Sequence, residues 1–196
     1  MAVKSSFKNM TICLLAICLV CSGLLAGVYA LTKEPIDNAA KAKNEAAIKE
    51  VLPETAVAIE EERTVEMSGE TYTYNLAYDQ LGNTVGCAVN ISTLGFGGPI
   101  VIKVGFDVNG IIWNTKVLSQ SETPGLGAEI TTPKHQAMYV GKSVYENDQL
   151  VGITLKKGGA EKGNPHQVDA ITGGTKTSDG VTAMISDCLN YYKPYF

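Results

Sequence analysis

The stretch IVIKVGFDVNGIIWNTKVL, residues 100–118, decides the fold class of this chain. β-branched and aromatic residues fill both halves of it, and Asn109-Gly110 between them is a strong two-residue hairpin signal. A similar pair of runs lies upstream, where residues 71–78 (TYTYNLAY) and 85–91 alternate apolar with other side chains on either side of Gly82-Asn83. Two hairpins in succession predict a domain built on antiparallel β-sheet.

Helical patterns flank these strands. The sequence predicts a short helix over residues 134–140 and a short strand near 153–156. The clearest helix is SDGVTAMISDCLNYY (178–192), whose apolar residues recur at helical spacing: Val181, Met184, Ile185, Cys188, Leu189 and Tyr192. Strands with helices at both ends, and without regular βαβ alternation, predict an α+β domain rather than a doubly wound sheet.

The N-terminal part contains an uncharged run from Met10 to Leu31, and roughly 20 such residues can span a bilayer as a helix. Lys4 and Lys8 precede this run, which favours a cytoplasmic N-terminus and an extracytoplasmic C-terminal part. We therefore expect a cytoplasmic tail (1–9), a transmembrane helix (10–31), a juxtamembrane helix (32–53, starting near Asp37) and an extracytoplasmic domain (54–196). A cleaved signal peptide ending near Ala30 remains an alternative.

Charge and cysteine content exclude other classes of protein. The formal net charge is -4 and no Lys/Arg-rich tract occurs, so the chain lacks the basic surface that nucleic-acid binding requires. Of five cysteines, three lie in the apolar run, while Cys87 and Cys188 stand alone without metal-type spacing. We expect no metal site, and the sequence leaves open whether Cys87 and Cys188 form a disulfide.

The first motif that carries chemistry is DAITGGT, residues 169–175, directly before the C-terminal helix. Glycines permit positive φ and close approach to a ligand, and the positive end of a helix dipole favours an anion. The segment is therefore a predicted phosphate seat, although a plain turn and helix cap fits the same letters. Its members are Thr172, Gly173, Gly174 and Thr175, with Lys176 as a counter-charge.

The second motif is ETPGLG, residues 122–127, about fifty residues earlier. Taken alone, it predicts a surface turn of type II with Leu126 buried as a tether.

Both motifs resemble those of the FMN-binding domain family. DAITGGT resembles the sequence D-x-x-[ST]-G-[AG]-[ST] that periplasmic flavin transferases modify, and ETPGLG resembles the second loop of the same family. Together with GFGGPI (95–100) and KGG (157–159), they make the chain similar to the G subunits of Rnf-type complexes. The C subunits of sodium-pumping NADH:quinone reductases share both motifs and are the close alternative. Gly174 departs from the Ala usual in the family.

The resemblance implies one FMN per chain, joined through its phosphate to Thr175, with Asp169 recognised by the flavin transferase. It also implies that Leu126 and Gly125 lie against the flavin ring and that Glu122 and Thr123 meet its polar edge. It implies an electron-transfer subunit in a ferredoxin:NAD oxidoreductase of the bacterial inner membrane, which moves sodium ions or protons. The expected partners are iron–sulfur and second flavin subunits of that complex. No catalytic acid or nucleophile and no independent turnover are expected, because the flavin performs the redox chemistry. A membrane-tethered binding domain without flavin is the competing class.

Overall fold

The computed structural model describes residues 6–67, 70–147 and 149–192. The chain divides into two compact units, Met1–Lys43 and Asn44–Phe196. The boundary between them falls inside one long helix, α1 (Phe7–Val51).

The N-terminal unit contains most of α1, a helix of 45 residues. We expected a separate helix beginning near Asp37, but α1 runs through Pro35 without interruption. A proline inside a helix removes only one backbone hydrogen bond, so the flanking residues can remain helical. The helix is long and apolar enough to cross a membrane, and none of the 18 residues in its most apolar stretch is buried in the protein. A signal sequence near the N-terminus has the same features.

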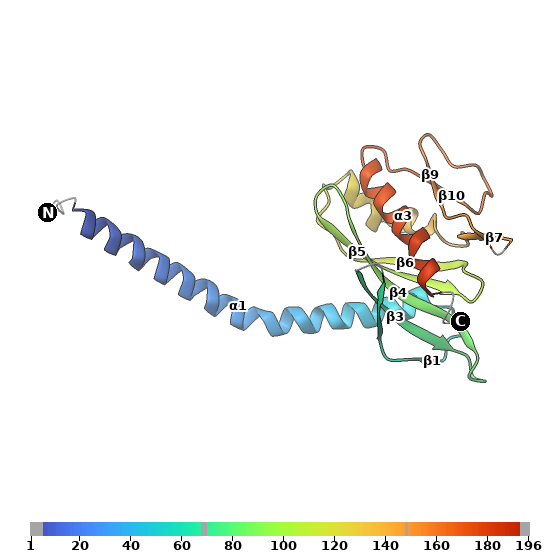
Figure 1. The fold of residues 1–196 in the computed structure, drawn as a ribbon, viewed down its shortest axis with the longest axis horizontal. Coiled ribbons are helices and arrows are strands. Elements are labelled where there is room, and N and C mark those ends of the chain that lie inside the picture. The colour runs from blue at the N-terminus through green and yellow to red at the C-terminus, as the bar shows by residue number, and fades with distance from the viewer. Residues whose placement is uncertain (1–5, 68–69, 148, 193–196) are drawn as a thin grey trace. The chain divides into compact units, whose positions relative to one another are not determined.

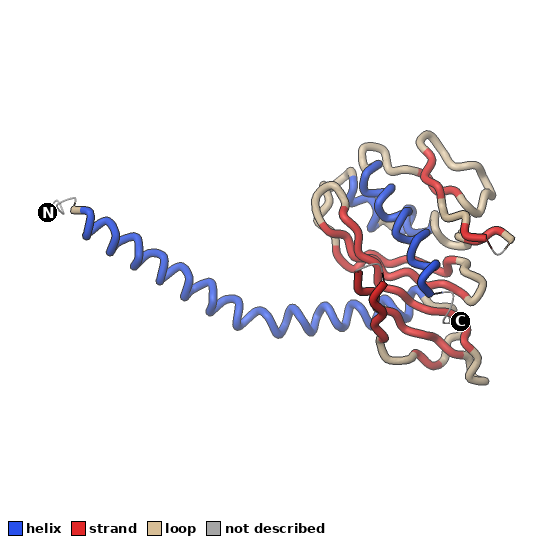
Figure 2. The backbone as a smooth tube through the Cα atoms, viewed as in Figure 1, coloured by secondary structure: helices blue, strands red, loops and turns tan. Residues whose placement is uncertain are grey.

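The second unit is built on a six-stranded antiparallel sheet, which confirms the predicted fold class (Figures 1 and 2). The strand order is β1-β3-β4-β5-β6, with β2 paired to β3. The strands are β1 (Ala58–Ile59), β2 (Arg63–Met67), β3 (Glu70–Tyr78), β4 (Thr84–Leu94), β5 (Pro99–Asp107) and β6 (Ile112–Ser119). Both predicted hairpins, β3–β4 and β5–β6, are present.

The connection between β5 and β6 is longer than the two residues that Asn109-Gly110 predicts. Gly110 N donates to Asp107 O at 3.0 Å, Gly110 has a φ of 75°, and Asp107 N donates to Ile111 O at 3.0 Å. The Asp107 carboxylate accepts from the backbone N–H groups of Asn109 and Ile111 at 2.9 and 2.8 Å. This side chain replaces hydrogen bonds that a tighter loop would make within its own backbone, so Asn109 needs no positive φ.

Successive residues of a strand point to opposite faces, and each face of this sheet has its own core. One face packs against α3 (Thr175–Tyr192), with Ile102, Val104, Val181 and Ile185 in a single buried cluster. The other face packs against the C-terminal turns of α1, where a separate cluster joins Ile48, Val51, Leu52, Ala77 and Ala88. The end of α1 therefore belongs to the folded domain.

The remaining elements connect β6 to α3. They are the 3-10 helix η1 (Gly127–Thr131), α2 (Pro133–Ala137), β7 (Tyr145–Glu146), β8 (Gln149–Leu150), β9 (Thr154–Lys156) and β10 (Gln167–Asp169). The helix expected over 134–140 is thus shorter than predicted, and the strand expected near 153–156 is β9. β10 pairs in parallel with β9 and leads directly into the DAITGGT loop and α3.

Cys87 and Cys188 are buried free thiols in the same core cluster. Burial raises the pKa of both thiols well above the usual range, which keeps them protonated. They pack as small apolar residues in this state of the protein.

Candidate functional site

The loop before α3 has a defined turn geometry. Gly174 N donates to Ile171 O at 3.0 Å, and Gly173 has a φ of 76°, as position i+2 of a type II turn requires. The Ser178 hydroxyl accepts from Ile171 N at 3.1 Å and donates to Gly174 O at 3.0 Å. The first turn of the helix therefore holds the loop that precedes it, and α3 begins at Thr175.

The ETPGLG motif forms the expected type II turn. Leu126 N donates to Thr123 O at 3.2 Å, and Gly125 has a φ of 74°. Leu126 is not buried as the turn-only interpretation expected, because 43% of it is exposed. The Thr123 side chain is exposed, and its carbonyl also accepts from Ala128 N at 3.2 Å.

The two motifs pack directly against each other. A Cβ added at Gly173 would lie 2.6 Å from Leu126 Cδ2, and one added at Gly174 would lie 3.2 Å from Gly127 Cα. Each of these glycines therefore leaves room for the opposite loop. Segments about fifty residues apart in sequence form one surface at the start of α3.

Glu122 joins three segments through one buried carboxylate. It is 6% exposed, its Oε1 accepts from Gly97 N at 2.8 Å, and its Oε2 accepts from the Thr177 hydroxyl at 2.6 Å. A Cβ at Gly127 would lie 2.1 Å from Oε2, and one at Gly95 would lie 2.2 Å from Oε1. The glycines of GFGG and ETPGLG thus make space for this carboxylate, a role that their sequence did not reveal.

The predicted acceptor and its neighbours lie on the accessible side of this junction. Thr175 is half-buried, and Thr172 and Lys176 are exposed. The Thr175 hydroxyl makes no hydrogen bond with any residue that the structure describes. The helix N-terminus adds the positive end of its dipole at the same place.

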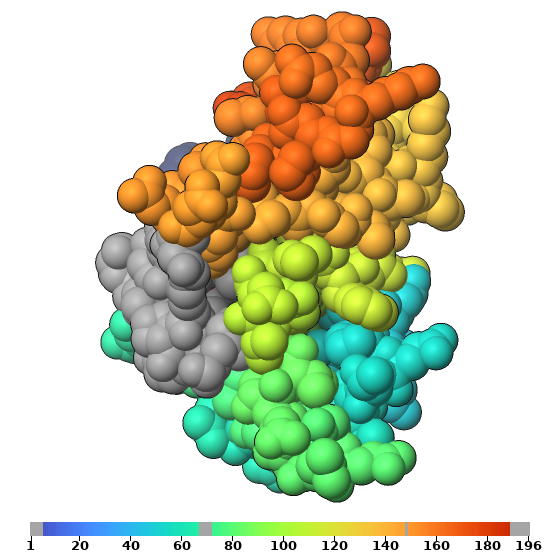
Figure 3. All heavy atoms as spheres, turned by 90° about the vertical axis from the view of Figure 1, so that its right-hand side faces the viewer, coloured from blue at the N-terminus to red at the C-terminus, as the bar shows by residue number. Residues whose placement is uncertain are grey.

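A pocket of about 360 Å³ opens beside this loop. Its lining comes from two chain segments: Glu129, Thr132, Lys134, His135 and Met138 on one side, and Asp169, Ala170, Ile171 and Thr172 on the other. In the space-filling view of Figure 3, the segment around β9 and β10 (orange) lies against the segment around η1 and α2 (yellow). The lining combines apolar side chains with a few charged groups, as cofactor pockets commonly do.

Asp169, the predicted recognition residue, is half-buried at the end of β10. Its carboxylate accepts a hydrogen bond from Ala160 N, which holds the loop after the KGG segment. A second hollow of about 190 Å³ borders Asp169, Met138 and Lys162 on the side of that loop.

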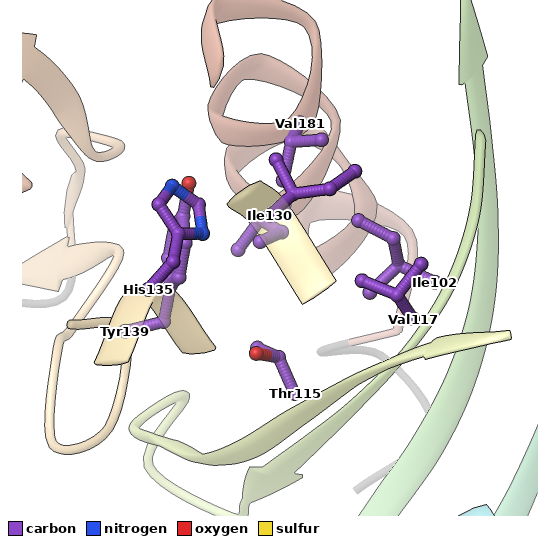
Figure 4. Close-up of a pocket in the computed structure, with 8 residues that line it drawn as sticks. Ile102, Thr115, Val117, Ile130, His135, Tyr139 and Val181 are labelled. Carbon is purple, nitrogen blue, oxygen red and sulfur yellow. The ribbon is translucent and has the colours of Figure 1, made fainter. Parts of the chain in front are cut away.

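His135 was assigned no role from the sequence, yet it is 4% exposed and borders the 360 Å³ pocket. Its ring meets Tyr139 edge-on, with 5.5 Å between centroids, and the Tyr139 hydroxyl hydrogen-bonds with Thr182 Oγ1 at 2.9 Å. Burial lowers the pKa of His135 to about 4, so the imidazole is neutral at pH 7. His135 also borders a small buried cavity of about 10 Å³, opposite Thr115 and between apolar side chains (Figure 4).

The other histidine, His166, forms hydrogen bonds within the protein. Its Nδ1 lies 2.8 Å from the Ser143 carbonyl, and its backbone N–H donates to the Asn164 side chain at 2.9 Å. These contacts hold the segment that leads into β10.

Two models of known protein families match this chain, one over the domain that contains both motifs and one over the N-terminal part. The model of the FMN-binding domain matches residues 95–190, which include both motifs, GFGG and most of α3. The chain is therefore an FMN-binding domain protein. The model of the RnfG N-terminal region matches residues 1–51, and the chain accordingly belongs to the family of G subunits of Rnf-type ion-translocating oxidoreductase complexes.

Individual relatives agree with this assignment. The G subunit of an ion-translocating oxidoreductase complex from Methanosarcina acetivorans is 28% identical over 97% of both chains. The C subunit of the Na+-translocating NADH-quinone reductase from Pasteurella multocida is 48% identical over 39% of this chain and 28% of its own length. The corresponding protein of Vibrio alginolyticus is 45% identical over 32% and 24%. The similarity to these two reductase proteins thus spans about a quarter of their length.

Solved structures share the fold. The crystal structure of the reductase's C subunit from Parabacteroides distasonis gives a TM-score of 0.56 at 26% identity, over 77% of this chain and 81% of that one. Shewanella oneidensis NqrC gives a TM-score of 0.55 at 24% identity, over 67% and 64%. The α+β assignment is confirmed by this similarity.

Proposed function

We propose that the chain is the electron-transfer subunit of an ion-translocating oxidoreductase complex and carries one FMN, bound covalently to Thr175. The observation that carries the proposal is the junction of the two motifs. Glu122 links the ETPGLG loop to α3, and Leu126 packs on Gly173 beside the 360 Å³ pocket. A phosphate seat and an apolar loop therefore lie within reach of one flavin mononucleotide.

The described residues fit FMN at both ends. Near Thr175, the exposed backbone at Thr172 and Gly173, the Lys176 ammonium and the helix dipole favour a phosphate. Gly173 and Gly174 allow the chain to pass close to the ligand. When bound, FMN would supply the redox chemistry, because its ring accepts and releases electrons.

The remaining predicted residues fall into two roles. Leu126 and Gly125 present a partly exposed surface on which a flat ring can pack, and Thr123 lies exposed beside it. Glu122 acts by positioning the loop, since both of its oxygens already accept hydrogen bonds from Gly97 and Thr177.

Attachment requires a separate flavin transferase, because a threonine hydroxyl is a poor nucleophile without an activating base. An activated donor such as a flavin dinucleotide balances the step. The ester bond from Thr175 Oγ1 to the FMN phosphorus forms, the pyrophosphate bond breaks, and the nucleoside monophosphate leaves with the hydroxyl proton. We assign Asp169, at the end of β10, to recognition by that enzyme.

We further propose that α1 anchors the chain in the bacterial inner membrane, with the FMN domain outside the cytoplasm. Its uncharged run is long enough to span the bilayer, and Lys8 precedes it on the expected cytoplasmic side. The partners are the iron–sulfur and second flavin subunits of the complex, between which the FMN relays electrons. The match along the whole length of an Rnf-type relative, rather than a quarter of a reductase protein, supports this placement.

Thr175→Ala tests the attachment, with Thr172→Ala as the matched control in the same loop. We expect wild-type protein, produced together with a flavin transferase, to show a fluorescent band on a denaturing gel and the added mass of one FMN. Thr175→Ala should lose both completely, because its hydroxyl is the only one at the end of the motif. Thr172→Ala should at most reduce them. An unchanged band in Thr175→Ala, or no flavin in the wild type, contradicts the proposal and favours a binding domain without flavin.

A further inference from the structure

An exposed apolar surface lies beside the proposed flavin site. Leu94 and Phe96, in and next to the turn between β4 and β5, are 73% and 77% exposed. The nearby ETPGLG loop adds Leu126, which is 43% exposed. Single exposed apolar side chains are common on proteins, but a group of neighbouring ones marks an interaction site.

The turn between β4 and β5 packs against the segment that leads into ETPGLG and against α3. A Cβ added at Gly97 would lie 2.2 Å from the Ser121 carbonyl oxygen, and one added at Gly98 would lie 3.5 Å from Ser121 Cβ. A Cβ added at Gly180 of α3 would lie 3.3 Å from the Leu94 carbonyl oxygen. The exposed residues of segments 92–99 and 119–124 thus form one surface beside the start of α3, which we call the uncharged turn surface.

The composition of the uncharged turn surface favours a protein partner. Glu122 is the one charged residue in its two segments, and that side chain is buried. The centres of protein interfaces are depleted of charged residues and enriched in aromatic ones, as this surface is. Adsorption to an anionic bilayer relies on Lys and Arg near the apolar side chains, and neither segment contains one. A lipid surface is therefore the poorer match.

The turn is ordered by contacts within the protein. Gly95 N donates to Gly98 O at 2.9 Å, and Gly97 N donates to the buried Glu122 carboxylate at 2.8 Å. Association costs less free energy when the loop that binds is already in its bound conformation. None of the described residues that line the pockets of about 360 and 190 Å³ belongs to this turn, so Leu94 and Phe96 remain accessible to a partner.

We propose that the uncharged turn surface is the docking site of another electron-carrying subunit of the complex, with Phe96 and Leu94 as its apolar anchors. This inference rests on the proposed function, because it names the partner that exchanges electrons with FMN on Thr175. The chain belongs to a family of complex subunits, so other subunits accompany it. Leu126, the proposed ring contact, directly borders the surface, and a subunit docked there comes close to the flavin. The matching face of that subunit is uncharged and apolar, in an interface below about 1,200 Å², as is usual for electron-transfer contacts.

Photo-crosslinking in native membranes identifies what covers this surface. A photoreactive phenylalanine analogue replaces Phe96 in the full chain, and the same analogue in place of Leu81 is the matched control. Leu81 is 86% exposed in the turn between β3 and β4, at the opposite end of β4. We expect position 96, but not position 81, to crosslink to another electron-carrying subunit of the complex, identified by mass spectrometry. Crosslinks from position 96 to lipid, to a second copy of this chain or to nothing would overturn the inference, as would equal crosslinking from both positions.

Phe96→Ser, with Leu81→Ser as its control, measures the effect on electron transfer in the assembled complex. When reduced ferredoxin is the electron donor, the rate of FMN reduction should fall about ten-fold in Phe96→Ser, because loss of an anchor at an interface centre weakens binding by at least that factor. Leu81→Ser should keep the wild-type rate. Both variants should keep the wild-type melting temperature, because both side chains are exposed.

The midpoint potential of FMN separates docking from a direct flavin contact. Phe96→Ser should leave the potential and the rate of reduction by dithionite unchanged, because a small reductant needs no docking surface. A shifted potential, or a wild-type rate with ferredoxin, would overturn the inference. A wild-type chain that carries no FMN would instead overturn the proposed function, whatever position 96 crosslinks to, so the two failures are distinguishable.

Discussion

At the scale of single residues, Glu122 is the centre of the site's architecture. Its carboxylate accepts from the Gly97 backbone and from the Thr177 hydroxyl, and glycines at 95 and 127 leave room for it. A carboxylate with two donors and little solvent contact forms stronger hydrogen bonds than neutral pairs do. The loop that carries Leu126 therefore depends on Glu122 for its position.

Glu122→Ala should lower the free energy of unfolding by about 3 kcal/mol. The substitution leaves the Gly97 backbone N–H and the Thr177 hydroxyl without their acceptor. Glu122→Gln should cost less, since its amide oxygen still accepts one hydrogen bond. Urea unfolding measures both, and Glu129→Gln, an exposed glutamate in η1, serves as the control. If Glu122→Ala unfolds at the same urea concentration as the control, the carboxylate does not hold the loops together.

His135 predicts a pH dependence of stability. Its pKa falls from 6.5 to about 4 on folding because burial disfavours the charged ring. In the unfolded chain, His135 therefore binds a proton below pH 6.5, whereas in the folded chain it binds one only below about pH 4. The free energy of unfolding should not depend on His135 above pH 6.5, and it should fall by up to about 3 kcal/mol as the pH drops to 4.

Unfolding curves of the flavin-free protein between pH 7 and pH 4 measure this slope. His135→Phe removes the titrating group and should flatten the curve over that range. A substitution of the half-buried His166 is the control, and it should leave the fall in the free energy of unfolding between pH 6.5 and pH 4 unchanged. A curve of equal slope in His135→Phe would assign the effect to the carboxylates.

At the scale of elements, two tight turns build the site, and each turn contains a glycine with positive φ. Gly125 and Gly173 both have positive φ, at 74° and 76°. A Cβ at Gly125 would meet nothing within 4 Å, whereas one at Gly173 would lie 2.6 Å from Leu126 Cδ2. The first turn needs glycine for its backbone alone, and the second needs it also for packing.

Gly125→Ala should therefore lower the free energy of unfolding by about 1 kcal/mol, the usual cost of a left-handed backbone at a residue with a Cβ. Gly173→Ala should lower it further and should also reduce flavin attachment, because the Leu126 side chain must turn away from the DAITGGT loop. Thermal unfolding and gel fluorescence measure the two effects. Equal stability losses with undiminished fluorescence would mean that the contact between the loops is unimportant.

At the scale of the whole molecule, the last turns of α1 belong to the FMN domain. Ile48 and Val51 are buried against Ala77 and Ala88 of the sheet, and Gly105 leaves space for the Val51 carbonyl. Lys116 on β6 forms a salt bridge with Glu50 at 2.7 Å, and Asn114 Nδ2 donates to Glu50 O at 3.1 Å. A truncation meant to yield a folded domain should keep residues 44–52.

N-terminal sequencing of protein extracted from membranes tests the topology. We expect residues 1–30 to remain attached, because the uncharged run from Met10 to Leu31 exceeds the roughly 7–15 residues of a usual signal-peptide core. Protease added to intact spheroplasts should digest the FMN domain. A mature chain that starts at Leu31 would identify the segment as a signal peptide.

The sequence by itself determined the antiparallel sheet, the C-terminal helix and the two glycine motifs, because these depend on local periodicity and on turn residues that act over a few positions. It also carried the family resemblance, since each motif is a short continuous segment. All of these features depend on residues close to one another in the sequence.

Only the tertiary structure decided what joins the motifs. Glu122 was predicted from its motif as a contact of the ring edge, but its partners, Gly97 and Thr177, lie 25 and 55 residues away along the chain. No spacing rule anticipates which distant donors meet a carboxylate. His135 is the same case: its burial and its unpaired Nε2 arise from α2 packing beside β10 and α3, and packing between distant segments is the part of the fold that local patterns do not encode.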